Sequence, residues 1–331
     1  METLDISQPE APQDPPAVAT VEEAVAALRR GGLVGFPTET VYGLGADARN
    51  PQALARLFEV KGRPAAHPVI VHIADASALA QWARDIPEYA QRLARAFWPG
   101  PLSLVLKRAE GVLDAVTGGQ DTVGLRVPSH PVAQELLQAF GGGIAAPSAN
   151  RFGRVSPTEA GHVRADLGAD VDVVLDGGRS QVGIESTIVD CSGERPVLLR
   201  PGRITAAQVE EVAQVPLAAP DETSTRAPGT LASHYAPRAK LRLLKRTGML
   251  EAISAHKGRR IAALAIEVAV PRVSAALLIV VPAVAAEYAR ALYANLRALD
   301  AAGADLILVE LPPDTPAWAG VLDRLRRAAG S

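Results

Sequence analysis

Hydrophobic and polar positions follow two different periods along the first two hundred residues. Apolar residues at helical spacing predict helices at 20–31, 50–62, 130–142 and 205–212, with two shorter helices within 77–100 that are separated at Pro87. Apolar runs typical of strands lie between them, at 33–36, 67–73, 101–107, 122–128, 143–150, 171–178, 186–192 and 196–202. Because the predicted strands outnumber the helices, we expect a mixed α/β sheet rather than a strictly parallel one.

Capping residues mark where several helices begin. Thr20 with Glu23 forms a capping-box pattern, and Asn50 precedes Pro51, which suits the first helical position. Ser156 with Glu159 has the same capping-box pattern and predicts a helix over 156–168.

The periodic pattern stops at residues 214–238, which contain four prolines and predict a long linker. After it, strands are predicted at 241–245, 259–268, 276–282 and 305–313, alternating with a long helix at 283–303 and a final helix. This order indicates a small Rossmann-like α/β domain, although no G-x-G-x-x-G turn is present. The predicted organisation is a disordered leader (1–18), a catalytic domain (19–213), a linker or lid (214–238) and a C-terminal domain (239–331).

The composition indicates that any site for an anion must be built from a few neighbouring residues, because the chain as a whole is not basic. The 331 residues are 48% hydrophobic and carry a formal net charge of −2, so a global basic field that attracts nucleic acid is not expected. Cys191 is the only cysteine, which excludes an internal disulfide and a cysteine-based metal site. Because the sequence shows neither a signal peptide nor a run of membrane-spanning length, we expect a cytoplasmic protein.

The candidate chemistry lies at strand ends, where polar residues interrupt the apolar pattern. P-loop, H-E-x-x-H and G-x-S-x-G motifs are absent from the sequence. The interrupting residues are Thr38, Glu39, Thr40, Lys61, Arg63, His67, His72, Thr122, Arg126, Ser148, Asn150, Ser186, Thr187 and Arg200. Ligands of open α/β sheets bind in the crevice at strand ends, so these groups predict one pocket with several cations and hydroxyls. Such a pocket suits an anionic, phosphate-bearing substrate.

Several of these segments together resemble one family. The segments "GFPTETVYGLGADA", "KGRP", "HPVIVHI", "FWPGPLSLVL", "GLRVPSHP", "APSANRFGRVSPT", "ESTIVD", "LRPG" and the linker "APGTLASHYAP" are similar to the Sua5 form of the YrdC/Sua5 family, the threonylcarbamoyl-AMP synthases. The resemblance is dense from Ala24 to Arg203. It implies a YrdC-like twisted mixed sheet with a deep cavity, plus a C-terminal domain tethered by a linker that folds over the cavity mouth.

The resemblance also implies a reaction. The family makes threonylcarbamoyl adenylate and pyrophosphate from L-threonine, bicarbonate or CO2, and ATP with Mg²⁺ on its phosphates. A separate transferase machinery then uses the product to modify the adenosine beside the anticodon of certain tRNAs. The expected partners are therefore small-molecule substrates and that machinery, without a membrane.

The resemblance assigns roles to individual residues. Lys61 and Arg63 match the family's K-x-R, and Ser148 and Asn150 match its S-x-N; these four are the catalytic candidates for the triphosphate and its Mg²⁺. The implied ATP site contains Arg63, His67, Thr122, Ser148, Ser156, Arg200 and Tyr235. The implied threonine site contains Thr40, His72, Arg126, Ser186 and the backbone near Ala146. The family often has asparagine where this chain has His67, so any shared role there is a hydrogen bond.

Simpler readings accompany these assignments. Thr38 and Thr40 taken alone would cap a turn, and His72 alone would be a core histidine. Lys61 and Arg63 are expected at a helix end beside solvent, while Gly43 and Gly45 would let the backbone approach a substrate.

Two further functions stay open: a non-catalytic RNA-binding module, and a carbamoyl-transfer domain of the kind used in hydrogenase maturation.

Overall fold

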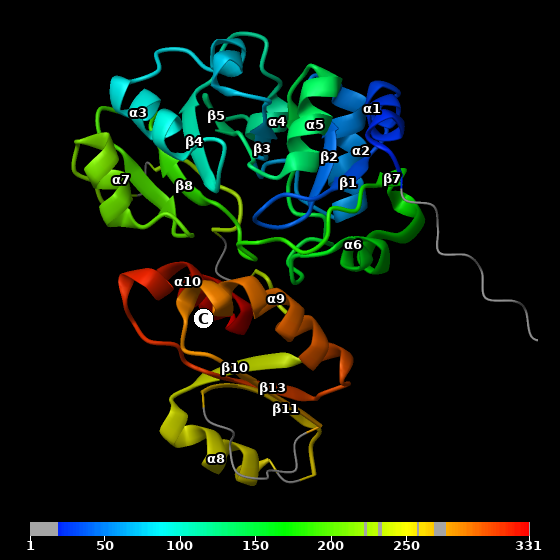
Figure 1. Ribbon diagram of the computed structural model, residues 1–331, viewed down its shortest axis with the longest axis vertical. Coiled ribbons are helices and arrows are strands. Elements are labelled where there is room, and N and C mark those ends of the chain that lie inside the picture. Colours follow the sequence, from blue (N-terminus) through cyan, green and yellow to red (C-terminus); the bar gives the residue numbers. More distant parts are fainter. Residues whose placement is uncertain (1–18, 222–223, 231–233, 257, 268–275, 331) are drawn as a thin grey trace, which may run out of the picture.

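The computed structural model describes residues 19–221, 224–230, 234–256, 258–267 and 276–330. Figure 1 shows two α/β domains, a larger one built on the first two hundred residues and a smaller one formed by the C-terminal part. The two-domain α/β architecture predicted from the sequence is therefore confirmed.

The larger domain contains a nine-stranded sheet in the order β7-β1-β2-β6-β3-β5-β4-β8-β9. Its strands are β1 (Val34–Phe36), β2 (Gly43–Asp47), β3 (Ile70–His72), β4 (Leu102–Lys107), β5 (Thr122–Arg126), β6 (Ile144–Ala145), β7 (Val173–Val174), β8 (Thr187–Asp190) and β9 (Val197–Arg200). Parallel pairs such as β3 with β5 alternate with antiparallel pairs such as β4 with β5, so the predicted mixed sheet is confirmed. Strand β2 was not predicted.

Helices pack around this sheet. They are α1 (Val21–Arg29), α2 (Pro51–Lys61), α3 (Glu88–Phe97), α4 (Asp114–Thr117), α5 (Pro131–Phe140), α6 (Ala160–Leu167) and α7 (Ala206–Ala213), with the 3-10 turns η1 (Ala76–Gln81) and η2 (Gly168–Asp170).

The predicted helix starts hold at two of three positions. Thr20 and Glu23 form the reciprocal capping box of α1, and Asn50 caps α2 with Pro51 at its start. The prediction for Ser156 is wrong, because α6 begins at Ala160 and the Ser156 hydroxyl donates to Glu185 instead. The Ser156 hydroxyl therefore bonds to a side chain 29 residues away instead of capping the helix that follows it.

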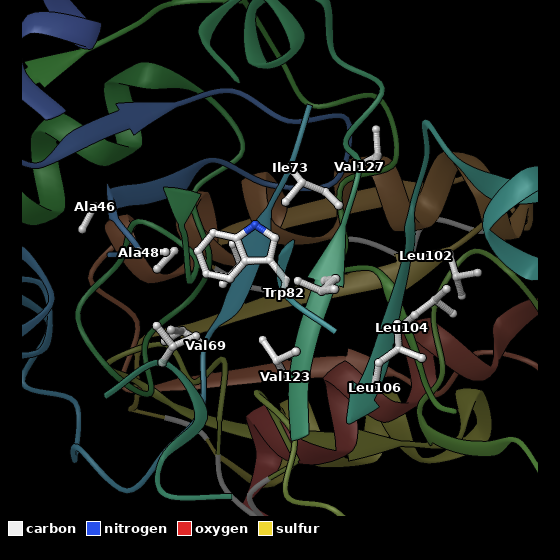
Figure 2. Packing of buried hydrophobic residues seen from close by; sticks show 14 of the residues in the cluster. Ala46, Ala48, Val69, Ile73, Trp82, Leu102, Leu104, Leu106, Val123 and Val127 are labelled. Atoms are coloured by element: carbon white, nitrogen blue, oxygen red, sulfur yellow. The ribbon is translucent and has the colours of Figure 1, made fainter. Parts of the chain in front are cut away.

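The largest hydrophobic cluster lies between the sheet and its helices (Figure 2). Trp82 is 3% exposed and packs against Gly143, just before β6, where a Cβ would lie 2.3 Å from the indole ring. Leu102, Leu104 and Leu106 of β4 are buried in the same cluster. Truncating one such leucine to alanine typically costs about 2–5 kcal/mol of stability. This packing gives the strand ends a rigid support.

The smaller domain has a four-stranded, fully parallel sheet in the order β10-β13-β11-β12. The strands are β10 (Lys240–Leu244), β11 (Ile261–Ile266), β12 (Leu277–Val281) and β13 (Leu306–Glu310); the helices are α8 (Arg246–Ala255), α9 (Ala285–Ala301) and α10 (Ala319–Ala329), with the turn η3 (Pro316–Trp318). In Figure 1, α9 and α10 lie between this sheet and the larger domain, and α8 lies on the opposite side. The predicted Rossmann-like order is confirmed.

Helices α9 and α10 contact the larger domain at backbone distance. Gly183 has φ +79°, and a Cβ there would lie 2.4 Å from the Cα of Arg290 in α9. Gly320 in α10 approaches Gly202 so closely that a Cβ would lie 3.0 Å from its Cα. Because only glycine fits these positions, the two domains meet at a tightly packed interface.

Candidate active site

A pocket opens at the strand ends of the larger domain. Its walls come from the β1–β2 loop, the ends of β3, β5, β6, β8 and β9, and the segment after α2, with one side formed by the linker. The lining residues are Thr38, Thr40, Val41, Gly43, Arg63, Ile70, His72, Arg126, Ala146, Pro147, Ser148, Glu185, Ser186, Arg200, Pro228, Gly229, His234 and Tyr235. Nine of the residues that the sequence put forward for ATP or threonine are among them.

Arg126 lies at the end of β5 beside two side chains of the β1–β2 loop. Its Nη1 donates to the Thr40 hydroxyl (2.8 Å), and its Nη2 lies 2.7 Å from Glu39 Oε1. The ion pair is buried, but neither of those two atoms makes a well-oriented hydrogen bond within the described residues. Arg126 therefore keeps donor capacity toward a second carboxylate.

Thr38 and Thr40 form the turn that opens β1 into the cavity. Their hydroxyls lie 2.9 Å apart, and Thr38 Oγ1 donates to the carbonyl of Val41 (2.6 Å). The turn-capping role is thus present, and Thr40 also holds Arg126.

Arg200 at the end of β9 joins the start of β8 to the linker. Its Nε and Nη2 donate to the Ser186 carbonyl (3.1 and 2.9 Å), and its Nη1 donates to the carbonyl of Pro228 (2.9 Å). Ser186 also has its hydroxyl 2.8 Å from that of Ser103. Arg200 therefore fixes the position of the linker while its charge stays in the cavity wall.

His72 on β3 is buried and makes an edge-to-face contact with Phe36, 5.9 Å between ring centres. Burial, with the Arg126 charge nearby, lowers the pKa of His72 to about 3, so the ring is neutral at pH 7. Its Nδ1 has no hydrogen-bond partner among the described residues. Ala146 contributes to the wall, but its N–H is already bonded to the carbonyl of Ile70.

Arg63 and Ser148 face the cavity from the opposite wall. Arg63 donates to the carbonyl of Pro68 (2.8 Å), stacks over Phe152 at 5.6 Å, and leaves Nε without a partner among the described residues. Burial lowers the pKa of Arg63 to about 10, which keeps it charged at neutral pH. Among the described residues this buried cation has no carboxylate partner, which suits an anionic ligand.

Lys61 and Asn150 lie behind this wall and do not line the cavity. Lys61 is 2% exposed, and its Nζ donates to the backbone carbonyls of Ser148 and Asn150, each at 2.5 Å. Asn150 Nδ2 donates to the carbonyls of Arg151 and Arg154. The expectation that Lys61 and Arg63 sit beside solvent is therefore wrong: both are buried, because the loop after β6 folds over the end of α2.

Three more of the candidates stand outside the cavity wall. His67 contacts Phe152 edge-on at 5.5 Å, and Phe152 in turn contacts His234 at 5.6 Å. Thr122, at the start of β5, has a buried hydroxyl with no hydrogen-bond partner in the described residues. Ser156 reaches the site only through Glu185, whose Oε1 accepts its hydroxyl at 2.6 Å.

His234 and Tyr235 bring the linker into the cavity. Tyr235 is 1% exposed with φ +61°, a left-handed conformation that a tyrosine rarely adopts. It stacks on Tyr293 of α9 (5.8 Å between ring centres), while the N–H of His234 donates to the carbonyl of Arg327 in α10 (3.2 Å). The second domain therefore holds this part of the linker against the site.

Gly43 and Gly45 have a different role from the one expected. A Cβ on Gly45 would lie 2.8 Å from Ile144 and 3.0 Å from the Phe36 ring, and one on Gly43 would lie 3.3 Å from Ala146. Gly45 lies away from the cavity wall, so glycine is needed there because of packing within the sheet. Gly43 does line the cavity, although the same Phe36 ring also restricts it.

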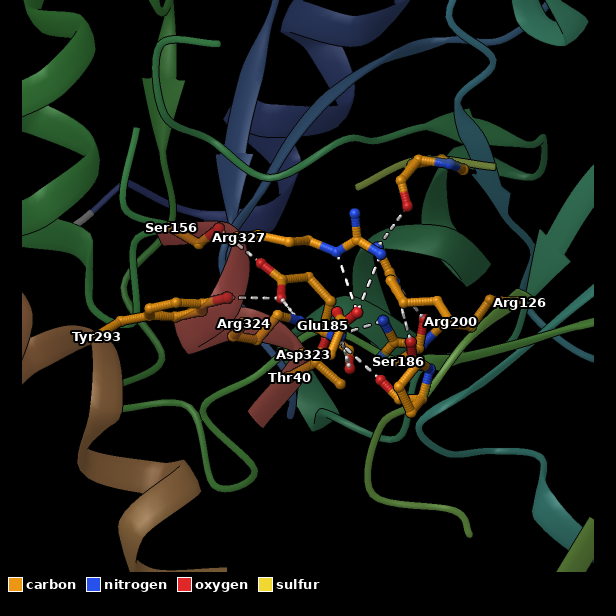
Figure 3. Close-up of polar contacts among 12 residues, drawn as sticks. Thr40, Arg126, Ser156, Glu185, Ser186, Arg200, Tyr293, Asp323, Arg324 and Arg327 are labelled. Carbon is orange, nitrogen blue, oxygen red and sulfur yellow. Dashed lines mark hydrogen bonds and ion pairs between the residues drawn. The ribbon is translucent and has the colours of Figure 1, made fainter. Parts of the chain in front are cut away.

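Sequence reasoning missed Glu185, Tyr293 and Arg324. Figure 3 shows that all three side chains meet beside Ser186 and Arg200. Tyr293 and Arg324 lie more than a hundred residues from Glu185 along the chain, on helices whose apolar pattern explains them as packing faces, so no local signal marks them.

The described residues contain neither a ready-made metal centre nor a membrane-spanning helix. No group of three or more His, Cys, Asp or Glu side chains there is arranged to hold a metal ion. Among the same residues, no helix combines the length and apolar character needed to cross a membrane.

The fold and the cavity define a two-domain α/β protein with a pocket lined by three arginines and by the linker between the domains. A family profile described as "Telomere recombination" (Sua5_yciO_yrdC) matches residues 26–202, and a second, "Threonylcarbamoyl-AMP synthase, C-terminal domain", matches residues 204–330. Proteins named threonylcarbamoyl-AMP synthase are 40% identical in *Pyrococcus abyssi* (92% of each chain covered) and 40% identical in *Bacillus subtilis* (94% of this chain, 93% of the relative).

A solved structure has the same fold over nearly the whole length. The crystal structure of *P. abyssi* Sua5 complexed with L-threonine superposes with a TM-score of 0.87 at 38% identity, covering 94% of each chain. The chain belongs to the threonylcarbamoyl-AMP synthase family.

Proposed function

We propose that this cavity forms threonylcarbamoyl-AMP. The amine of L-threonine adds to CO2 with release of a proton, or condenses with bicarbonate with release of water, and gives a carbamate. A carbamate oxygen then attacks the α-phosphorus of ATP. The bond from that phosphorus to the bridging oxygen breaks, and pyrophosphate leaves with the electron pair. Both reactants are anions, so the protein must hold them together against repulsion, which is a task of positioning and electrostatics.

The observation that carries this proposal is the convergence of three buried guanidinium groups on one cavity. Arg126, with Thr40 and the neutral His72 beside it, suits the carboxylate and hydroxyl of threonine. Arg63 and Arg200 lie toward the linker wall, where they suit the phosphates of ATP. Such forks bind carboxylates and phosphates with defined geometry.

Lys61 and Asn150 enter this proposal as residues that shape the phosphate wall. Lys61 fixes the carbonyls of Ser148 and Asn150, so the Ser148 hydroxyl keeps a constant position in the cavity. Mg²⁺ would be held by the phosphates of ATP with Ser148 nearby. The lack of a three-ligand acid or histidine cluster in the described residues is compatible with a metal that arrives on its nucleotide.

The linker is proposed to act as a lid. Residues 214–238 separate the two proposed units, 19–213 and 239–331, and Pro228, Gly229, His234 and Tyr235 form one cavity wall. Excluding water matters because the product is a mixed anhydride that hydrolyses readily.

Delivery of the product to a tRNA-modifying transferase, in the cytoplasm, belongs to the same proposal. The structure gives less support to an RNA-binding module, since the three arginines are buried in the wall of a pocket rather than exposed along a surface.

The test is a reconstitution with purified full-length protein, MgATP, L-threonine and ¹⁴C-bicarbonate. We expect pyrophosphate release together with a labelled adenylate, and each omission of threonine or bicarbonate should abolish both. Serine should be a weaker substrate, because recognition of one methyl group is worth only about 1–3 kcal/mol. Equal ATP turnover without any amino acid would refute the proposal.

A further inference from the structure

Glu185 places a carboxylate in the wall of a cavity that is proposed to receive anions. Of the described residues that line the cavity, Glu185 alone is acidic. It precedes Ser186 in the chain and lies close enough to Arg200 for the two charges to interact. It is 7% exposed. A fixed negative charge here would repel a polyphosphate and would compete with it for Arg200, because buried charges interact strongly.

The second domain supplies the partner for this carboxylate. Arg324 of α10 is fully buried; its Nε donates to Glu185 Oε2 (2.8 Å) and its Nη2 donates to the Glu185 carbonyl (3.1 Å). Tyr293 of α9 donates its hydroxyl to the same Oε2 (2.8 Å), while Ser156 donates to Oε1. Figure 3 shows these groups converging on Glu185 from the two domains.

Arg324 is itself held in place by contacts with the larger domain, with the linker and with its own helix. Its Nη1 donates to the Pro201 carbonyl (2.9 Å), and its guanidinium lies over the ring of Tyr235, 5.4 Å from the ring centre. Asp323 also accepts from Nη1 (2.8 Å). Burial opposes ionisation of Glu185, but Arg324 and Arg200 together lower its pKa to about 2, so the carboxylate is charged at neutral pH.

We propose that Arg324 is a positioning residue that neutralises Glu185, so that Arg200 and Arg63 present an uncompensated positive charge to a polyphosphate in the cavity. The second domain thereby sets the charge of a site whose lining residues belong to the larger domain and the linker. The inference rests on the proposed function to the extent that it requires the cavity to bind ATP.

Charge compensation and simple packing predict different ATP affinities when the charges of Glu185 and Arg324 are both removed. If Arg324 acts by its charge, Arg324→Met should weaken ATP binding and the double variant Glu185→Gln/Arg324→Met should restore it. If Arg324 acts only as an anchor between the domains, the double variant should bind no better than the single one. Such a double-mutant cycle isolates the coupling between the two residues.

The experiment measures binding of MgATP, pyrophosphate and L-threonine to full-length protein by isothermal titration calorimetry. The variants are Arg324→Met, Arg324→Lys, Glu185→Gln and the double variant, with Asp166→Asn as the control. Asp166 forms a different interdomain ion pair, with Arg297, that does not face the cavity. Unfolding curves establish which variants are folded.

We expect Arg324→Met to weaken ATP and pyrophosphate binding by about tenfold or more, because an unpaired buried charge is left behind. Threonine, which carries no net charge, should lose less than about threefold, and Arg324→Lys should stay close to wild type for all three ligands. The double variant should recover ATP affinity to within about threefold of wild type. Asp166→Asn should bind all ligands as wild type does.

Four results would overturn the inference. One is equal loss of ATP and threonine binding in Arg324→Met, and another is a folded double variant with ATP affinity more than tenfold below wild type. The second criterion still applies if Arg324→Met alone does not fold. Third, wild-type protein that binds neither ATP nor pyrophosphate would overturn the proposed function together with this inference. Wild-type binding with an unchanged Arg324→Met affinity would overturn the inference alone.

Discussion

The Nζ of Lys61 lies 2.5 Å from the backbone carbonyl oxygen of Asn150, at the point where the loop after β6 crosses the end of α2. The same nitrogen donates to the Ser148 carbonyl. Burial, together with the charge of Arg63, holds the pKa of Lys61 well below its usual range. These contacts make Lys61 a support of the cavity wall rather than a group that faces the cavity.

Replacing Lys61 by methionine should therefore reduce both activity and stability. Two buried carbonyls lose their donor, and each buried unsatisfied group costs about 1–3 kcal/mol. We expect a lower urea midpoint and a lower rate of pyrophosphate release. Lys107→Met, at a side chain that is 42% exposed, is the matched control and should change neither. Loss of activity with an unchanged midpoint would instead favour direct contact of Lys61 with the phosphates.

A second prediction concerns recognition of threonine. Arg126→Gln removes the guanidinium that lies between Thr40 and Glu39, so the KM for threonine should rise by about 30-fold or more, which corresponds to ~2 kcal/mol for a buried charge-assisted contact. The KM for ATP should change much less. Steady-state kinetics with each substrate varied in turn separates the two effects, and an equal rise in both values would contradict the assignment.

Local signals in the sequence identified the elements that depend on neighbouring residues. Thr20 with Glu23 and Asn50 with Pro51 act within one helical turn, so the starts of α1 and α2 could be predicted. The strand ends that carry Arg126 and Arg200 and the helix end next to Arg63 were predicted for the same reason, since each follows a periodic apolar pattern.

The parts of the site that depend on distant partners could not be predicted from local patterns. Lys61 finds its carbonyls 87 and 89 residues away, and Glu185 finds Arg324 at a separation of 139 residues. Ser156 shows the conflict directly, because its sequence neighbours favour a helix cap while its hydroxyl bonds to Glu185. Tertiary contacts outcompete a local hydrogen bond wherever they satisfy a buried charge.

A third prediction tests the proposed lid at Gly229. This glycine has φ +74°, and a Cβ there would lie 2.1 Å from the Tyr235 hydroxyl and 3.0 Å from Arg200. Gly229→Ala should displace the tyrosine and lower kcat/KM for ATP by on the order of 10- to 100-fold, as small misplacements of binding groups do. Gly193→Ala, where no atom lies within 4 Å of the added methyl, should behave as wild type. Unchanged kinetics of Gly229→Ala would argue against a role for the linker wall.

The last prediction concerns stability in weak acid. Burial lowers the pKa values of His72 and His234 to about 3, whereas an unfolded histidine titrates near 6.5. Between these values the unfolded chain binds more protons than the native one, so stability is full above about pH 6.5 and falls as the pH decreases toward 3. Each histidine contributes a slope of about 1.4 kcal/mol per pH unit. Glu185 adds to the loss only between about pH 4.5 and 2, because its native pKa is lowered to about 2.

The measurement is the free energy of unfolding in urea at pH 7.0, 6.0 and 5.0, a range in which the histidines titrate and Glu185 stays charged. His234→Gln cannot take up a proton, so its stability should fall less steeply than that of wild type, by about 1.4 kcal/mol per pH unit in the lower part of the range. At pH 7 the free energy of unfolding of the variant should differ from that of wild type only by the change in packing. Parallel curves for the two proteins would show that His234 is not held neutral in the folded state, and the linker would then have to be hydrated around it.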